Sequence, residues 1–236
     1  MLKMVLATAR DRARLKEITS VLIRYGLQDV LRLLGLGALL RGARAGSAQQ
    51  DAQTLPERLR EALEALGPTF VKFGQILATR SDLLDPAWTD KLDRLHSRAA
   101  VLPWETLAPQ IVADLGGEPE RLFAEFDRTP LAAASMAQIY RVRLHSGEQV
   151  VVKVLRPGLA KTIHADLRLL ASLAETVEQQ SPALARYRPR QMVRALATAL
   201  NHELDLTHEG HNCDRVAGMF AHQPDVVVPK IYWQWS

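Results

Sequence analysis

The spacing of hydrophobic residues predicts helices along the first half of the chain. Leu59, Leu63 and Leu66 recur at intervals of three and four residues, which places apolar side chains on one helix face. Gly67-Pro68 ends this helix and begins the next, because glycine favours a helix end and proline fits the first helical position. Two amphipathic helices are expected over residues 1–45, broken near Gly26 and followed by a polar linker at 46–53, and further helices are expected from Asp85-Pro86 onward and over 104–115, 159–179, 189–204 and 207–221.

The spacing then changes to a strand pattern. Tyr140, Val142 and Leu144 alternate with polar residues, which indicates a half-exposed strand. Ser146-Gly147 supplies a hairpin turn, and residues 149–155 form a nearly continuous apolar strand. Two more short strands are predicted at residues 226–228 and 230–233.

Composition places the chain among ordinary globular proteins. Its 236 residues are 47% hydrophobic, enough to bury a sizeable core. The net charge is only +4 and aromatic residues make up 6%, so a nucleic-acid binder with a dense basic stripe is not expected. Cys213 is the single cysteine and cannot form an internal disulfide, which favours a reducing compartment. His208 and His211 are expected to be solvated helix residues, and no metal site is assigned.

The early helices raise the question of a membrane. The sequence shows no secretory signal peptide, and residues 30–40 supply only about half of the ~20 apolar residues that a bilayer crossing needs. The leucine-rich face with Arg24, Arg32, Arg41 and Arg44 could lie on an anionic membrane surface. The alternative is an amphipathic helix packed on its own domain.

Residues 132–137, followed by Lys153, are the strongest candidates for chemistry. A small-residue loop between strands and a lysine on the next strand is the layout of a protein-kinase nucleotide lobe. The neighbours of Lys153 are apolar, so its stem is expected to be partly buried and its ammonium to need a carboxylate or a phosphate. Kinases use glycine in the loop because bare backbone can approach the phosphates. With alanines instead, the nucleotide is expected to be held differently, and Ser135 can supply a hydroxyl.

Four short motifs follow one another along the chain. They are Lys72, Gly74 and Gln75; residues 132–138; Val152-Lys153-Val154 with Arg156-Pro157-Gly158; and Glu203-Leu204-Asp205, followed by Glu209, Asn212 and Arg215. In this order they resemble the KxGQ motif, the alanine-rich loop, the lysine strand and the ExD motif of the UbiB family of atypical kinase-like proteins. The resemblance covers roughly residues 55–236, and it departs from the family at 95–104, where His96-Ser97 and a lone Pro103 replace a Gln-Asp pair and a double proline.

The resemblance implies a nucleotide site and a regulatory contact. Lys153 is expected to pair with Glu209 of a regulatory helix and to contact the nucleotide phosphates. The residues expected to bind the nucleotide are Lys153, Ala133, Ala134, Ser135, Met136, Ala137 and Glu209.

The regulatory contact joins two of the motifs. Lys72 and Gln75 are expected to fold over the nucleotide lobe near Glu203 and Asp205, where they occlude the place of a protein substrate. Glu203 and Asp205 are expected about 200 degrees apart around one helix, so that a lysine from another helix can reach one of them. The alternative for this pair is a solvated acidic face.

No catalytic residue is assigned. A kinase needs a catalytic-loop Asp closely followed by an Asn, and an Asp-Phe-Gly metal ligand. His164-Ala165-Asp166 is only superficially similar, because Ala171 stands where the Asn is needed and the segment lies in a helix too close to Lys153. The chain ends in an apolar segment, 232–235, where the second lobe would begin. It is therefore expected to be a truncated form, inactive alone, with the magnesium ligands in the absent lobe.

The expected fold class is α+β, with a helical N-terminal extension and the small lobe of a protein-kinase-like fold that has inserted helices and no second lobe. Three parts are expected: amphipathic helices and linker at 1–50, a helical extension with the KxGQ motif at 51–125, and the nucleotide lobe at 126–236.

The family implies ATP and magnesium as cofactors and a kinase-like or ATPase role in ubiquinone biosynthesis, although whether this chain is an enzyme stays open. The expected location is cytoplasmic and peripheral to the inner membrane, with membrane lipid and ubiquinone-biosynthesis proteins as candidate partners. The alternative is a non-enzymatic regulatory or scaffold module that binds lipid or biosynthetic partners.

Overall fold

The computed structural model describes residues 9–34, 36–40, 53–95 and 100–236. The chain forms two compact units, one of Met1–Ser97 with Lys161–Thr198 and the other of Arg98–Ala160 with Ala199–Ser236. The division into parts at 1–50, 51–125 and 126–236 was made for domains, which these compact units do not test, so it stays a prediction. Residues 46–52 of the predicted linker at 46–53, and the departure at His96-Ser97, lie outside the described residues.

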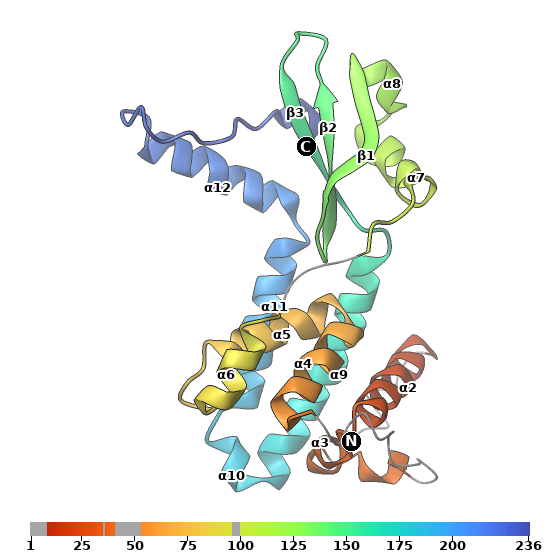
Figure 1. Ribbon diagram of the computed structural model, residues 1–236, viewed down its shortest axis with the longest axis vertical. Helices are drawn as coiled ribbons and strands as arrows, with labels where there is room; N and C mark the ends of the chain where they lie inside the picture. Colours follow the sequence, from red (N-terminus) through yellow and green to blue (C-terminus); the bar gives the residue numbers. More distant parts are fainter. Residues whose placement is uncertain (1–8, 35, 41–52, 96–99) are drawn as a thin grey trace. The chain divides into compact units, whose positions relative to one another are not determined.

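Helices make up the first unit (Figure 1). Gly26 has a φ of 68° and separates the first two helices, which confirms the predicted break. Asp85 accepts a hydrogen bond from the backbone N–H of Ala87 and caps the helix that Pro86 begins, also as predicted. The elements are α2 (Ala9–Arg24), α3 (Gln28–Leu33), the short 3-10 helix η1 (Gly37–Leu40), α4 (Leu55–Leu66), α5 (Pro68–Ala78), α6 (Pro86–Leu92), α10 (Pro182–Ala185) and most of α9 (Leu159–Gln180) and α11 (Pro189–Glu203).

The core of this unit contains the leucine-rich face of the early helices. Leu31 and Leu36 are buried, and Val30, Leu34 and Leu40 pack against the same cluster, which also contains residues of α2, α4, α5 and α9. This burial supports the alternative in which the amphipathic helices pack on their own domain. Among the described residues, no helix is both long and apolar enough to cross a membrane.

A buried ion pair joins α2 to α9 inside the first unit. The guanidinium of Arg14 donates to both carboxylate oxygens of Asp166, at 2.6 and 3.0 Å, and to the carbonyl oxygen of Leu66 at 2.6 Å. Burial lowers the pKa of Arg14, but its hydrogen bonds and charge pairing with Asp166 and Glu17 outweigh that effect and raise the pKa overall. Asp166, in the segment that superficially resembles a catalytic loop, therefore serves as the buried partner of Arg14.

The second unit contains a three-stranded antiparallel sheet in the order β1-β2-β3 (Figure 1). The sequence did not predict the first strand, whose pairing is irregular on both sides of Pro130. Gly147 has a φ of 96° in the turn between the second and third strands, as the Ser146-Gly147 turn requires. The strands are β1 (Glu125–Ala133), β2 (Ala137–Arg143) and β3 (Gln149–Leu155).

Helices α7 (Trp104–Leu115) and α8 (Pro119–Leu122) lie beside β1 in the second unit (Figure 1). Leu107 and Ile111 of α7 pack on Tyr140 of β2 and Val154 of β3, so α7 covers the sheet face that carries these two residues. The ring of Trp104 meets that of Tyr140 edge-on at 5.7 Å between centroids. This mixture of helices and a small antiparallel sheet confirms the predicted α+β class.

The predicted strands at 226–228 and 230–233 are wrong. Within residues 100–236 this segment has no strand, and its end is a short 3-10 helix, η3 (Trp233–Trp235). A strand needs a neighbouring backbone for its hydrogen bonds, and no described strand pairs with this segment. Its aromatic side chains pack instead: Trp233 contacts Gly210 of α12 (Leu206–Met219) and donates to the carboxylate of Asp214 at 2.8 Å.

Candidate functional site

Lys153 and Glu209 form an ion pair in the second unit. The Nζ of Lys153 on β3 lies 2.6 Å from Oε2 of Glu209, which sits in the first turn of α12. This is the pairing that the resemblance implies. The side chain of Lys153 is 37% exposed and that of Glu209 is 56% exposed, so the stem of Lys153 is partly buried and a ligand can reach its ammonium group from solvent.

The sheet face that carries Lys153 also carries exposed apolar side chains. Ile139 of β2 is directly opposite Lys153, and Val151 precedes Lys153 by two positions, so all three project from the same face. Ile139 is half-buried and Val151 is 59% exposed. Neither residue was predicted from the sequence; the two-residue period of the strand points to Val151, whereas Ile139 depends on the register between β2 and β3.

The alanine-rich segment forms the turn between β1 and β2. The backbone N–H of Ala134 donates to the carbonyl oxygen of Ala137 at 2.9 Å and closes the turn. Ala133 and Ser135 are half-buried and Ala134 is exposed. Met136 and Ala137 are only 7% and 1% exposed, so these two predicted nucleotide-binding residues could reach a ligand through their backbone but not through their side chains.

Two further side chains hold this turn from outside it. Arg156 follows β3 and donates from Nε to the carbonyl oxygen of Ala134 at 3.0 Å. Gln138 is fully buried at the start of β2, donates to the hydroxyl of Tyr140 at 2.8 Å and accepts from the backbone N–H of Leu102. Burial lowers the pKa of Arg156 and raises the pKa of Tyr140. Both Arg156 and Gln138 belong to motifs that were recognised from the sequence, but no role was predicted for either residue.

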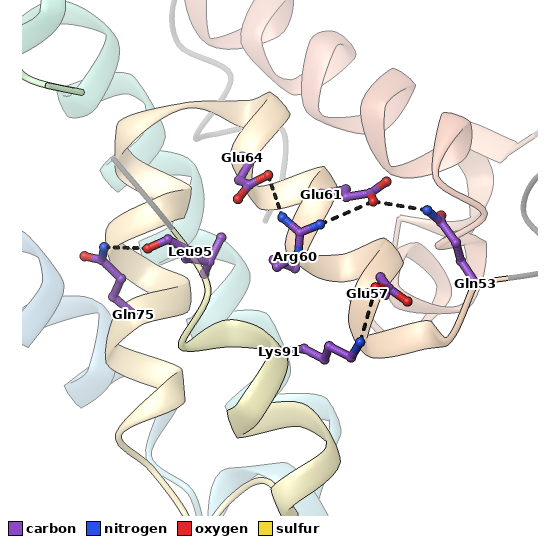
Figure 2. A network of polar contacts seen from close by, with 8 residues as sticks. All are labelled: Gln53, Glu57, Arg60, Glu61, Glu64, Gln75, Lys91 and Leu95. Carbon is purple, nitrogen blue, oxygen red and sulfur yellow. Dashed lines mark hydrogen bonds and ion pairs between the residues drawn. The ribbon is translucent and has the colours of Figure 1, made fainter. Parts of the chain in front are cut away.

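The KxGQ residues lie on α5 in the first unit. Gly74 faces α4 and the end of α6 so closely that a Cβ atom added to it would lie 2.8 Å from Leu63 Cδ1 and 2.3 Å from Leu95 Cδ1. Gln75 donates from Nε2 to the carbonyl oxygen of Leu95 at 3.2 Å (Figure 2). Lys72 is half-buried on the same helix. Gly74 therefore packs against the side chain of Leu95, and Gln75 hydrogen-bonds the backbone of the same residue.

The ExD residues do not share one helix, which corrects the expected 200-degree arrangement. Glu203 is the last residue of α11, whereas Asp205 is the N-cap of α12 and accepts from the backbone N–H of Thr207 at 3.0 Å. The two helices are separate because Leu204 and Asp205 leave the helical path between them. Hydrogen bonds from Thr207 hold the pKa of Asp205 below its usual value.

The expected contact between the KxGQ and ExD residues stays a prediction. Lys72 and Gln75 belong to the first compact unit, and Glu203 and Asp205 belong to the second. What the structure adds is a defined local role for Gln75 and for Asp205, each within its own unit.

Histidines near the ExD residues pack against rings. His208 stacks on His202 with 4.2 Å between ring centroids, and His211 lies 4.5 Å from the ring of Trp233. The described part of the chain contains no group of three or more His, Cys, Asp or Glu side chains placed to hold a metal ion.

Comparison with known proteins identifies a kinase-like domain in this chain. Residues 94–236 match the ABC1 atypical kinase-like domain. The chain is 39% identical over 232 residues to a protein named "Probable protein kinase UbiB" from Pseudomonas paraeruginosa, covering 94% of this chain and 43% of the relative. It is 40% identical over 220 residues to a protein of the same name from Xylella fastidiosa, covering 92% of this chain and 40% of the relative.

A solved structure also resembles this chain. It is titled "The complex structure of Rv3197-erythromycin from Mycobacterium tuberculosis", and it matches with a TM-score of 0.48 and 24% sequence identity over 73% of this chain and 40% of that chain. The chain spans less than half of the length of the relatives named above. Because a family domain matches more than half of the chain and both named relatives match it nearly end to end, the chain belongs to the UbiB family of ABC1 atypical kinase-like proteins.

Proposed function

We propose that the second unit is a nucleotide-binding lobe that takes ATP, and that it serves a UbiB-type kinase-like or ATPase protein in ubiquinone biosynthesis. The observation that carries the proposal is the Lys153–Glu209 ion pair, which lies on a sheet face with exposed apolar residues and on the strand next to the alanine turn. A location at the surface of the inner membrane, with lipid or biosynthetic proteins as partners, belongs to the same proposal and follows from the family.

The residues present fit the triphosphate of ATP. Lys153 offers a cation that solvent can reach, because its carboxylate partner is itself exposed. Among residues 100–236, neither the backbone N–H of Ser135 nor that of Met136 donates to another protein group. Unbonded backbone N–H groups in a turn and a lysine on the adjacent strand are the groups that hold phosphates in kinase lobes.

The same sheet face fits the base of the nucleotide. Val151 and Ile139 project beside Lys153 and expose apolar surface that an aromatic base would cover. Burial of such surface stabilises binding in proportion to the area removed from water. Polar phosphate contacts at one end and apolar base contacts at the other would fix the direction of the nucleotide along the sheet.

Glu209 acts by positioning Lys153. An exposed ion pair contributes at most about 1 kcal/mol to stability, so holding the fold together is a minor effect of this pair. Its geometric effect is larger, since the carboxylate fixes the ammonium group 2.6 Å away and on the face of the sheet where the phosphates would lie. ATP, when bound, supplies the phosphoryl group that kinase-like proteins transfer or hydrolyse.

Glu209 and Asp205 are already engaged by other groups of the protein. Glu209 is engaged by Lys153, and Asp205 is engaged by the backbone and hydroxyl of Thr207. We therefore assign no magnesium ligand to these two residues and derive no step through the metal. For the same reason, nucleotide binding rather than turnover is the property to measure on this chain.

Calorimetric titration with magnesium and ATP tests the proposal. Lys153→Ala is expected to weaken ATP affinity by about tenfold or more, because it removes a charge-assisted contact to phosphate. Lys72→Ala, a matched lysine on the first unit, is expected to weaken it less. Equal effects of the two substitutions would show that Lys153 is not the phosphate contact. No binding by the unaltered chain would favour the non-enzymatic scaffold function instead.

A further inference from the structure

The turn between β1 and β2 is a hairpin connection without glycine. The turns that best match the twist of paired strands need residues with positive φ, which alanine and serine adopt only at a cost. Over residues 100–236, Arg188 is the one non-glycine residue with positive φ, so Ala134, Ser135 and Met136 all keep ordinary negative φ. A turn of this kind needs other contacts to fix its shape.

Arg156 supplies contacts at both ends of the turn. Its backbone N–H donates to the carbonyl oxygen of Met136 at 2.9 Å, and its Nε donates to that of Ala134 at 3.0 Å. Its Nη2 donates to the carbonyl oxygen of Ala100 at 2.8 Å. Among the described residues, no carboxylate lies within ion-pair distance of this guanidinium. The half-buried guanidinium of Arg156 therefore donates to backbone carbonyl oxygens and not to a carboxylate.

Gln138 joins the same two segments of chain through a second set of hydrogen bonds. It exchanges hydrogen bonds with the backbone of Leu102, accepting from its N–H and donating to its carbonyl oxygen at 3.4 Å. Because Gln138 is fully buried, these bonds cannot be replaced by water without opening the core. Residues 100–102 thus form a backbone support that Arg156 and Gln138 tie to the alanine turn.

We propose that Arg156 is a positioning residue for nucleotide phosphates: it fixes the glycine-free alanine turn so that the N–H groups of Ser135 and Met136 stay available to a phosphate. Arg156 donates hydrogen bonds to the carbonyl oxygens of Ala134 and Met136. These bonds hold the turn, while the N–H groups of Ser135 and Met136 remain unbonded. The backbone N–H of Arg156 holds the Met136 carbonyl and its guanidinium holds the Ala134 carbonyl, so Arg156 fixes a turn that other kinase loops form with glycine. This inference rests on the proposed function in placing the phosphates at the turn.

The test combines amide hydrogen exchange with ligand binding in the full 236-residue chain. Arg156→Gln is expected to speed exchange of the backbone N–H of Ala134, which donates to the carbonyl oxygen of Ala137, by about fivefold or more, because the turn opens locally more often. It is also expected to weaken magnesium–ATP binding by about tenfold, which is the effect of losing roughly one charge-assisted hydrogen bond between a turn N–H group and the phosphate. Binding of adenosine, which lacks phosphates, should be unchanged when followed by saturation-transfer NMR. A residue with a merely structural role would weaken both ligands equally.

Two more variants complete the design. Arg156→Lys keeps the charge but cannot reach two carbonyl oxygens in a fork, so it should resemble Arg156→Gln; it also carries the test if Arg156→Gln fails to fold. Arg121→Gln, which removes the same charge from an exposed position on α8, should behave as the unaltered chain.

The outcomes separate this inference from the proposed function. Exchange at the turn that is unchanged in both Arg156 variants would overturn the inference even if ATP binds. If exchange rises but ATP affinity does not change, Arg156 supports the fold alone and the inference is also overturned. Absence of ATP binding in the unaltered chain would refute the proposed function. Faster exchange in the variants would then show only that Arg156 stabilises the turn.

Discussion

Replacing Gly74 of the KxGQ motif with alanine should destabilise the first unit. The added Cβ would lie 2.3 Å from Leu95 Cδ1 and 2.8 Å from Leu63 Cδ1, both below the closest approach that carbon atoms tolerate. Both leucines are buried in the core, so neighbouring side chains restrict how far they can move. Overpacking of this kind costs about 1–3 kcal/mol.

Helix propensity acts in the opposite direction and sets the net magnitude. Alanine is favoured over glycine by about 1 kcal/mol in a helix interior, and Gly74 lies inside α5. Because one of the two contacts is so short, we take the upper half of the overpacking range and expect a net loss of about 1–2 kcal/mol. That loss corresponds to a fall in melting temperature of a few degrees, at about 2–4 °C for each kcal/mol in a chain of this size.

Thermal unfolding followed by circular dichroism, with hydrogen exchange to locate the change in α5, measures the effect. Gly218→Ala is the matched control, because Gly218 lies in α12 with nothing within 4 Å of an added Cβ. It should leave stability unchanged or raise it by up to about 1 kcal/mol. If Gly74→Ala were as stable as the control, the close packing at Leu63 and Leu95 would not be the reason for glycine at this position.

Two further predictions concern charged residues. The pKa of Asp205 is depressed in the folded state, so its cap on α12 is fully present above the unfolded value of about 4 and is lost as the pH falls through the lower folded value. NMR exchange rates at Thr207 should rise over that range, and Asp205→Asn, which caps without titrating, should remove the dependence; the same acid response in both proteins would contradict this. Arg14→Ala should cost about 3–5 kcal/mol in urea unfolding, because it leaves the buried carboxylate of Asp166 without its cation. The double substitution of Arg14 and Asp166 with leucine should recover most of that loss, and a loss in Arg14→Ala of less than about 1 kcal/mol would show that water compensates Asp166.

Local sequence patterns identified most of the helices and two of the three strands. The leucine spacing before Gly67 gave α4, and the alternation around Tyr140 gave β2. The pattern failed for β1, because Pro130 cannot donate to a ladder and the pairing shifts register on both sides of it. It failed again at residues 226–233, because strand propensity has no effect where no neighbouring backbone is available to pair.

The sequence by itself determined which residues are proposed for the candidate site. Lys153 and the alanine turn were selected from residue type and order along the chain, and Glu209 was selected from the family resemblance of its motif. Local periodicity likewise fixed the strand that presents Lys153. These features depend on residues within one turn of helix or one strand, so they can be read from the chain directly.

Only the tertiary structure decided how the selected residues are used. Lys153 and Glu209 are 56 positions apart, and Arg156 and Ala134 are 22 apart, so each contact exists only because packing fixes both partners. Packing also buried the side chains of Met136 and Ala137 and separated Glu203 from Asp205 at a helix boundary. A hydrogen bond between distant residues depends on the whole fold to bring donor and acceptor within about 3 Å, and no local pattern contains that information.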